Sequence, residues 1–488
     1  MKQLIKMISL AIAILVFIVC SASAESIYTY DDLFSSRDLK QSADLSDAIT
    51  YTVSDGQQIT ITSEGVYVLT GSANNVTVYV EAGKEDKVQI VLNGVSITNS
   101  NFPVIYAKTA DKLFVTTSAD SNLSVTGTFT ADGSVNTDGV IFSKCDLVLN
   151  GTASLTITST QNGIVGKDDL KITGGVYTIT AQSKAIEAND SIRIAGGTLN
   201  LTAGTDGLHA ENSSDTSLGY IYIADGTLTI NAGDDGIHGT SVVQIDGGSM
   251  TIRASEGIEG TYVQINDGTI SIQSTDDGIN AANKSVAYRA TVEINGGDIT
   301  VSMSAGDTDG IDSNGDIIVN GGVISVTGNS TFDFDGSAQY NGGTIIANGQ
   351  QIAYIPNQMM GGRGSMGSMN SGNFDNTSNW GGGWNNDSCE LSVSSGLEGD
   401  DRVTTSAYGG TGIVRVYGVE VWSGSAEHTY DDTGCGGGGG YDDDYLGDEC
   451  DSCDEDCANG NCDSLEGTSL GSLKFRIPLG APVKGQIA

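Results

Sequence analysis

The sequence predicts an all-β fold, a parallel β-helix with three short strands per coil, followed by a Gly-rich linker and a small cysteine-containing tail. Two repeated motifs and the lack of any helical period predict it. The first motif, an acidic residue followed by Gly and an aliphatic residue, returns roughly every 21 to 32 residues, as solenoids require. Its copies begin at Asp138, Asp206, Asp235, Glu256, Asp277 and Asp309, with looser copies at Asn162 and Lys184. The second motif keeps step with it and begins at Gly174, Gly196, Gly247, Asp267, Gly296 and Gly321.

One unit, from Gly257 to Asp277, shows how a coil is built. Alternating runs such as Val263–Ile265 and Ile270–Ile272 flank the turn Asn266–Gly268, and alternation is the signature of a strand. Glycines recur at the turns, where we expect positive φ. Successive coils should then lie about 4.8 Å apart.

The chain divides in order into five predicted segments. Residues 1–24 form a secretory signal with two lysines, an apolar run and a small-residue cleavage site. Residues 25–137 form an N-terminal cap and first irregular coils, and residues 138–355 form the regular β-helix. Residues 356–388 are a linker rich in Gly, Met and Asn, and residues 389–488 are an acidic tail.

The tail contains six cysteines, at 389, 435, 450, 453, 457 and 462. An even number in an exported chain favours disulfides, and six cysteines permit 15 pairings. A zinc site is the alternative, because Cys450 and Cys453 have ligand-like spacing. The sequence stops soon after a strand-like segment, so a truncated reading frame is one interpretation.

Two repeat units are longer than the others. The extra residues, Glu211–Tyr220 and Asn283–Arg289, are polar and fall at the same corner of the coil. Insertions on one side of a solenoid often mark its binding side, and tolerated surface padding is the alternative.

The formal net charge is −39, with 61 acidic against 22 basic residues. This balance excludes nucleic acid and anionic membranes as electrostatic partners, which require basic patches. No segment after the signal is long and apolar enough to insert into a membrane. We expect a secreted or surface-held monomer.

In-register stacking would place the acids in columns. The first column contains Asp206, Asp235, Glu256, Asp277 and Asp309. Three residues further on, a second column contains Glu187, His209, His238, Glu259, Asn280 and Asp312. Two carboxylates about 4.8 Å apart repel by about 1 kcal/mol in water and about 3.5 kcal/mol at an effective dielectric of about 20. Oxygen ligands without thiolates select Ca²⁺, so the sequence predicts calcium between these acids.

The alternative is that each Asp bonds its own turn and points into water. We expect His209 and His238 to be exposed corner residues rather than ligands. A third column contains Cys145, Asp168 and Asp190, with Cys145 a buried or half-exposed free thiol.

The segments Phe142–Gly151 and Gly163–Gly175, with their Lys-Asp-Asp-Leu step and the Asp-Gly-Ile coils that follow, resemble the family of bacterial carbohydrate-binding β-helix proteins. That family was described from a cellulose-degrading clostridium and is associated with polygalacturonate and cellulose. The similarity covers roughly residues 45 to 355. It implies a right-handed parallel β-helix outside the cell, bound calcium, polysaccharide binding and a likeness in fold to pectate lyases. Cys145 departs from the repeat, which puts a cation at that coil in doubt.

Three functions remain open. The first is calcium-dependent binding of polygalacturonate, pectin or cellulose, with calcium shared between the protein and uronate carboxylates. The second is a pectate-lyase-like activity, whose base would come from Lys171, Arg193, Arg253 or Arg289. The third is a calcium-stabilised adhesin or spacer. Single charged residues on strands are usually solubility devices, so we expect a binding protein rather than an enzyme.

Overall fold

The computed structural model describes residues 26–304, 308–357, 403–408, 411–416 and 419–425. The chain forms two units, Met1–Ser368 and Met369–Ala488. Of the second unit, the structure describes an antiparallel sheet of β35 (Val403–Tyr408), β36 (Thr411–Val416) and β37 (Val419–Ser425). The signal segment, nearly all of the linker and the six tail cysteines lie outside the described residues.

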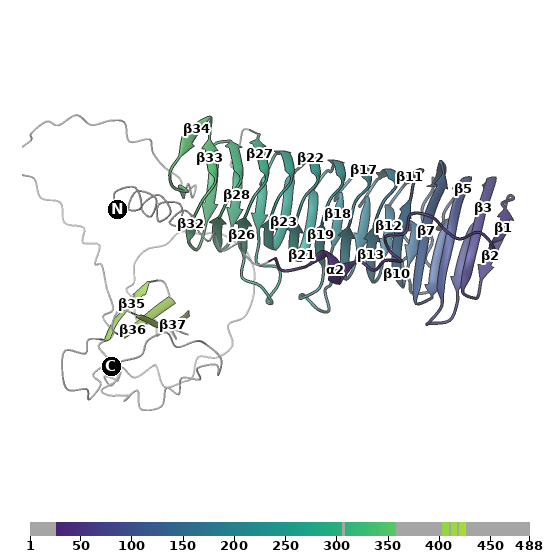
Figure 1. Ribbon diagram of the computed structural model, residues 1–488, viewed down its shortest axis with the longest axis horizontal. Coiled ribbons are helices and arrows are strands. Elements are labelled where there is room, and N and C mark those ends of the chain that lie inside the picture. The colour runs from purple at the N-terminus through teal and green to yellow at the C-terminus, as the bar shows by residue number, and fades with distance from the viewer. Residues whose placement is uncertain (1–25, 305–307, 358–402, 409–410, 417–418, 426–488) are drawn as a thin grey trace, which may run out of the picture. The chain divides into compact units, whose positions relative to one another are not determined.

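The described residues of the first unit form strands and one short helix, α2 (Tyr30–Leu33), and the strands form a single 34-stranded sheet. Nearly all pairings are parallel, and as a rule each strand pairs with the third strand before it and the third after it. The chain therefore passes the same place once per coil, and Figure 1 shows the strands side by side along the unit. None of the described helices is long and apolar enough to cross a membrane.

The strands fall into three columns, which we name by what covers or composes their outer surface. The strap face contains β1 (Ile49–Thr52), the first halves of β3 (Gly65–Asn74) and β5 (Lys87–Asn99), β7 (Lys112–Ala119), β10 (Asp146–Gly151), β13 (Asp169–Ile172), β16 (Ser191–Ile194), β19 (Tyr220–Ile223), the second halves of β21 (Asp235–Ile245) and β23 (Glu256–Ile265), β26 (Thr291–Ile294), β29 (Asp316–Val319) and β32 (Ala338–Tyr340).

The hydroxyl face follows in each coil. It contains the second halves of β3 and β5, then β8 (Ser121–Val125), β11 (Ser154–Ser159), β14 (Val176–Ala181), β17 (Thr198–Ala203), β20 (Thr227–Asn231), β22 (Ser249–Ala254), β24 (Thr269–Ser274), β27 (Asp298–Met303), β30 (Val323–Thr327) and β33 (Thr344–Ala347). Strand β34 (Gln350–Ile352) pairs antiparallel with β33.

The acidic face completes the coil. It contains β2 (Gln58–Ile61), β4 (Thr77–Glu81), β6 (Ile105–Thr109), β9 (Gly139–Ser143), β12 (Asn162–Gly166), β15 (Ile186–Ala188), β18 (Leu208–Ala210), the first halves of β21 and β23, β25 (Ile279–Ala281), β28 (Asp309–Ser313) and β31 (Ser330–Phe334).

The core lies inside the three columns and runs the length of the unit. Inward positions alternate with outward ones, so Ile186, Ile192 and Leu199 of one coil are fully buried. Each such side chain contributes about 1.5–3 kcal/mol on burial. Because every coil has this pattern, a one-residue slip would expose its whole apolar set.

Glycine is required at two corners for different physical reasons. Gly248 and Gly297 have φ of 93° and 89°, which confirms the predicted positive φ at the second motif. The expectation is wrong for the Asp-Gly corner, where Gly257 has no positive φ. A Cβ on Gly257 would instead lie 2.3 Å from the carbonyl oxygen of Gly278 on the next coil. That glycine is needed because two backbones approach closely.

The repeat copy at Asp138 is out of register. Strand β9 pairs Ile141 with Ile164 and Gly139 with Asn162, so Asp138 lies one residue before the acid column. The Asp138 motif therefore has the sequence of the repeat but not its structural position.

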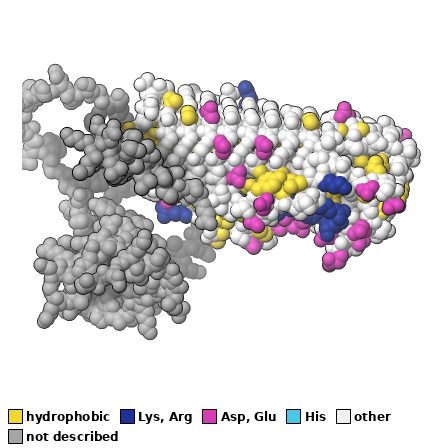
Figure 2. Space-filling view, in the orientation of Figure 1, with side chains coloured by type: hydrophobic (Ala, Val, Ile, Leu, Met, Phe, Trp, Pro, Cys, Tyr) yellow, Lys and Arg dark blue, Asp and Glu magenta, His cyan; other side chains and the backbone are white. Residues whose placement is uncertain are grey.

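Residues 26–41 form a strap that crosses the strap face lengthwise (Figure 1). Tyr28 and Gln244 exchange two hydrogen bonds of 2.7 and 2.9 Å. Further along, the buried carboxylate of Asp38 accepts a hydrogen bond from Lys171 at 3.1 Å. In Figure 2 a hydrophobic patch with Lys and Arg beside it lies where the strap crosses the coils. The strap thus ties together coils that are far apart in sequence.

Candidate functional site

The two predicted columns are present on the acidic face. Strand β21 pairs Asp235 with Glu256, and the aliphatic residues two positions later stay in register from Ile186 to Phe332. In the second column, Glu187, His209, His238, Glu259, Asn280, Asp312 and Asp333 follow one another coil by coil. Asp206, Asp235 and Glu259 are buried, with 5–7% of their surface exposed.

Two carboxylates of the first column, those of Asp206 and Asp277, bond to the neighbouring coil and not to their own turns. The Oδ1 atom of Asp206 accepts the backbone N–H of Asp235 at 3.3 Å, and Oδ1 of Asp277 accepts that of Asp309 at 3.2 Å. These bonds run to the next coil, so the alternative of solvated Asx turns is wrong for Asp206 and Asp277. The acids are drawn toward the backbone ladder instead of into water.

Cationic side chains neutralise the N-terminal half of the columns. Lys167 lies 2.8 Å and Lys184 3.7 Å from the carboxylate of Glu187. Lys284, from the loop between β25 and β26, lies 2.6 Å from Glu259. Burial opposes ionisation of Glu187 and Glu259. The lysines beside Glu187, and His238 together with Lys284 beside Glu259, nevertheless hold the pKa of both carboxyls below the ordinary value.

The two histidines lie between these acids and stack on one another. Their ring centroids are 4.6 Å apart, and each residue is only 7% exposed, so the expectation of exposed corner residues is wrong. Nδ1 of His209 is 2.8 Å from Asp206. Nδ1 of His238 is 2.6 Å from Asp235 and 2.8 Å from Glu259. Burial disfavours the charged imidazole, but the two carboxylates raise the pKa of His238 to about 9.

The C-terminal half has a different composition. It contains Glu256, Asp277, Asp309, Asp312 and Asp333. Among the described residues, Glu256, Asp277, Asp312 and Asp333 form no ion pair with Lys, Arg or His. Burial and the neighbouring acids raise the pKa of Glu256 and Asp312 to about 7 and that of Asp277 to about 6. Such shifts mean that a full set of negative charges is unfavourable there without a cation.

Asn280 lies in the middle of this acidic group. Its Nδ2 donates to Glu256 at 3.2 Å, whereas its Oδ1 is buried without a hydrogen-bond partner among the described residues. Asn280 as a whole residue is 9% exposed. A buried oxygen without a donor costs about 1–3 kcal/mol unless something else binds it. Carboxylate and amide oxygens are ligands that calcium prefers, so the residues fit Ca²⁺.

The third column lies where the acidic face turns into the strap face. Cys145 is a buried free thiol, as predicted, and its Sγ is 3.4 Å from the hydroxyl of Ser143. Burial, followed by the charge of Asp146, raises the pKa of Asp168 to about 6. Asp190 accepts a hydrogen bond from Asn212 at 2.7 Å.

The four basic residues considered for lyase chemistry are scattered. Lys171 is buried under the strap, and Arg193 pairs with Asp169 at 2.6 Å on the same face. Arg253 lies on the hydroxyl face, and Arg289 pairs with Asp316. None of the four lies on the acidic face, so they do not converge with the candidate metal ligands.

The two long insertions do share one side, as predicted. The loop between β18 and β19 and the loop between β25 and β26 lie at the same corner, and Ser285 donates a hydrogen bond to the carbonyl of Thr216. Sequence reasoning missed that the second loop delivers Lys284 to the acidic column. It also missed that the amide oxygen of Asn280 could serve as a metal ligand, although Asn280 belongs to the predicted column.

An aromatic column was also missed. Tyr79, Tyr106 and Phe142 occupy successive coils in the second column, N-terminal to the acids. Phe102 packs against Tyr79 and Tyr106 with ring centroids 6.1 and 5.9 Å apart. Tyr79 and Tyr106 lie in residues 25–137, where the repeat is irregular, so the sequence did not show that they align with Phe142 of the regular coils.

The chain is similar to a known protein family, to a curated protein and to a solved structure. A family model described as "Carbohydrate-binding domain-containing protein" matches residues 55–307 and 254–352. A curated protein of the same description from Acetivibrio thermocellus is 33% identical over 127 residues, which are 25% of this chain and 44% of that protein. The match thus spans less than half the length of the curated relative. A solved structure, described as the polysaccharide lyase-like protein from C. thermocellum in a gadolinium derivative, is 29% identical. It covers 46% of this chain and 96% of its own, with a TM-score of 0.41.

Proposed function

The chain belongs to the family of carbohydrate-binding domain-containing proteins, and from this premise we propose that it is an extracellular protein that binds plant-type polysaccharide, polygalacturonate (pectin) or cellulose. The signal-like segment 1–24 supports secretion, and we propose a monomer. We further infer that the fold is a right-handed parallel β-helix. The parallel pairing of every third strand supports that fold.

We propose that calcium binds in the C-terminal half of the acidic columns. Glu256, Asp277, Asp309 and Asp312 would supply carboxylate oxygens, and Asn280 would supply its unpartnered amide oxygen. The observation that carries this proposal is a group of three half-buried acids, Glu256, Asp277 and Asp312, that form no ion pair with a cationic side chain among the described residues. They lie beside the buried Oδ1 atom of Asn280, which accepts no hydrogen bond from the described residues. In the N-terminal half, lysine and histidine side chains already form ion pairs with Glu187, Asp206, Asp235 and Glu259. We therefore propose no calcium there.

Bound calcium would bring two chemical properties to the face. It would remove the repulsion between the acids, and it would leave coordination positions for carboxylates of an acidic polymer. The columns repeat along the axis, so a polymer with repeating uronates could bind at more than one point and gain avidity. An acidic protein could in this way hold an acidic polysaccharide.

The test is retention on insoluble polygalacturonate, with calcium or with a chelator. We expect retention of the wild-type chain in calcium and its loss in chelator. The variant D277N/D312N should lose at least about tenfold in calcium affinity by titration calorimetry and lose retention with it. The matched control D225N/D47N changes two exposed acids away from the columns and should behave as wild type. Retention that survives both chelator and D277N/D312N would contradict the proposal.

A stabilising role for calcium alone is the competing function. If calcium raises the melting temperature but neither polygalacturonate nor cellulose retains the chain, the protein is a calcium-stabilised adhesin or spacer. The same samples can be followed by ultraviolet absorbance, since an unsaturated uronate product would reveal lyase activity.

A further inference from the structure

The hydroxyl face has an unusual outer surface. Its middle outward column runs in register through Thr178, Asn200, Thr229, Thr251, Ser271 and Thr300. The columns on either side repeat the same chemistry, with Thr198, Thr227, Ser249 and Thr269 on one side and Thr180, Thr202 and Asn231 on the other. Nearly all of these side chains are exposed.

The face is nearly uncharged although the chain carries a net charge of −39. From β14 to β27 its outward strand positions include one cation, Arg253, and one carboxylate, Asp298. Along the upper edge of Figure 2, where Figure 1 places β11, β17, β22 and β27, the surface is largely free of charged and hydrophobic side chains. The acids are thus concentrated elsewhere, and this face suits a neutral ligand.

The hydroxyls are also available. Within the described residues, no hydrogen bond to protein engages the side chains of Thr178, Thr229, Thr251 or Thr300. Each β-branched side chain is restricted at χ1, and the parallel ladder holds each backbone. Neighbouring hydroxyls therefore repeat about every 4.8 Å along the unit and about every 6.6 Å along a strand. A ligand meets an array that is already ordered.

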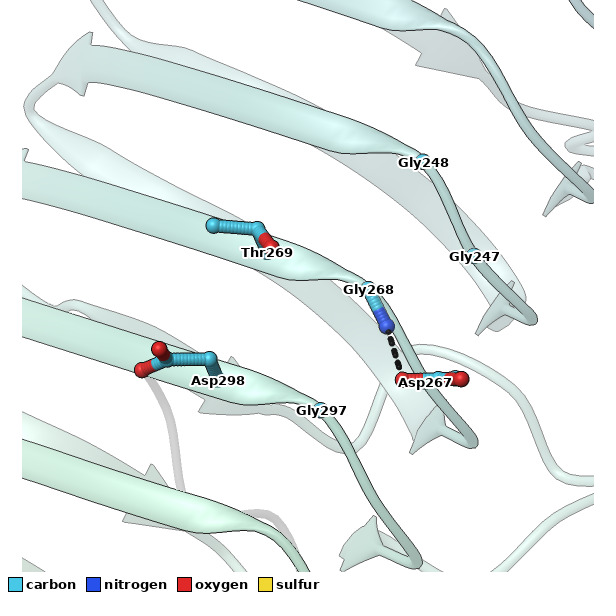
Figure 3. A pocket seen from close by; sticks show the side chains of 7 residues that line it. All are labelled: Gly247, Gly248, Asp267, Gly268, Thr269, Gly297 and Asp298. Carbon is cyan, nitrogen blue, oxygen red and sulfur yellow. Dashed lines mark hydrogen bonds between the residues drawn. The ribbon is translucent and has the colours of Figure 1, made fainter.

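One edge of the face carries a shallow hollow. Gly248, Gly268 and Gly297 line it with Asp267, Thr269 and Asp298 (Figure 3). The absence of side chains at the glycines makes the hollow, and Asp267 bonds its own turn through the N–H of Gly268 at 2.8 Å. The two carboxylates can accept hydrogen bonds from sugar hydroxyls, and they would repel a uronate.

We propose that the hydroxyl face binds the flat, ordered surface of an uncharged, extended glucan, without calcium. This rests on the proposed function only in that the ligand is a polysaccharide. A flat hydroxyl array can exchange hydrogen bonds with a flat hydroxyl-bearing polymer at many points, each of them weak, and the sum gives avidity. The acidic face would serve acidic polymers and the hydroxyl face neutral ones.

The experiment measures depletion of the full chain by microcrystalline cellulose and, in parallel, by polygalacturonate. The variant T178K/T251K places two long charged side chains on the hydroxyl face, three coils apart. We expect it to lose at least about tenfold in cellulose affinity and to keep its calcium-dependent binding to polygalacturonate. The control T50K/T60K changes two exposed threonines on the other two faces and should bind both polymers as wild type.

The two proposals fail in different ways. Chelator and D277N/D312N should abolish polygalacturonate binding and leave cellulose binding intact. Cellulose binding that requires calcium, or that T178K/T251K leaves unchanged, would overturn the inference about the hydroxyl face. Inhibition of ice growth by the wild type without any retention on cellulose would assign the face to ordered water and would also overturn it.

Discussion

His238 is buried between two carboxylates, Asp235 and Glu259, and shares a stack with His209. Its pKa of about 9 lies above the ordinary value of 6.5, so the folded state holds a proton that the unfolded chain releases near neutrality. The stabilisation is complete below about pH 6.5 and is lost as the pH rises through 9. The protonated imidazole of His238 thus supplies the positive charge between these two carboxylates of the columns.

We therefore predict that H238Q lowers the free energy of unfolding by about 3 kcal/mol at pH 6, because it leaves two buried acids without their cation. The difference from wild type should shrink as the pH rises from 6.5 to 9. Urea unfolding at several pH values measures both. The double variant H238Q/D235N should recover part of the loss, and an H238Q curve parallel to wild type at every pH would disprove the role.

Glycine acts at the same scale through steric contact. A Cβ at residue 257 would meet the carbonyl of Gly278 at 2.3 Å and Cγ2 of Ile272 at 2.5 Å. The first contact is with backbone, which cannot rotate away. Glycine is therefore required in the Asp-Gly motif because the backbones of neighbouring coils approach closely at that corner.

The second prediction is that G257A destabilises the protein by about 3 kcal/mol, as overpacking of a closed contact does. Gly196 is the matched control, because a Cβ there meets nothing within 4 Å. G196A should change stability by less than about 0.5 kcal/mol. Equal effects of both substitutions in thermal unfolding would refute the steric explanation.

At the scale of elements, the three faces separate three kinds of surface. The acidic face concentrates charge, the hydroxyl face is nearly uncharged, and residues 26–41 cover the middle of the strap face. Parallel stacking is the cause, because a residue type repeated at one position of the coil becomes a continuous column. The pKa values of about 7 for Glu256 and Asp312 are consequences of that repetition.

The third prediction concerns pH and calcium. The raised pKa values mean that these acids bind protons in the folded state that the unfolded chain has already released. Without calcium, stability should fall as the pH rises from about 4 to 7. Calcium should therefore raise the melting temperature by several degrees at pH 8 and by little at pH 5. Calorimetry tests this, and D277N/D312N should reduce the pH-dependent fall, since Glu256 remains, and remove the calcium effect.

At the scale of the whole first unit, the coils stack in one dimension and the strap bridges them. Asp38 is 1% exposed and its carboxylate contacts Lys171 at 3.1 Å and Lys112 at 3.5 Å. Beyond it, the Nε2 atom of Gln41 donates to the carbonyl of Thr173 at 2.9 Å. Contacts of this kind add long-range cooperativity to a fold whose other contacts are between neighbouring coils.

The fourth prediction is that D38A detaches the strap. It leaves two lysines beside a buried site without their carboxylate, which should cost about 3–5 kcal/mol if the strap stayed in place. Release of the strap avoids that cost, so amide exchange of residues 26–41 should accelerate at least about tenfold while the coils stay protected. K40A changes an exposed lysine of the same segment and serves as the control. Unchanged exchange in D38A would show that the strap is held by its aromatic contacts instead.

The repeat in the sequence determined the all-β class, the coil register and the two acid columns, because alternation and glycine spacing are local properties of the chain. It predicted the common corner of the two insertions for the same reason. Alternation and glycine spacing did not reveal which side chains from other parts of the chain contact each residue of the columns. Lys284 reaches Glu259 from a loop, Asp38 reaches Lys171 across the strap, and the threonines of separate coils meet as one face. Whether a buried acid is paired depends on residues far away in sequence, so only the tertiary structure decided which half of the column lacks a cation.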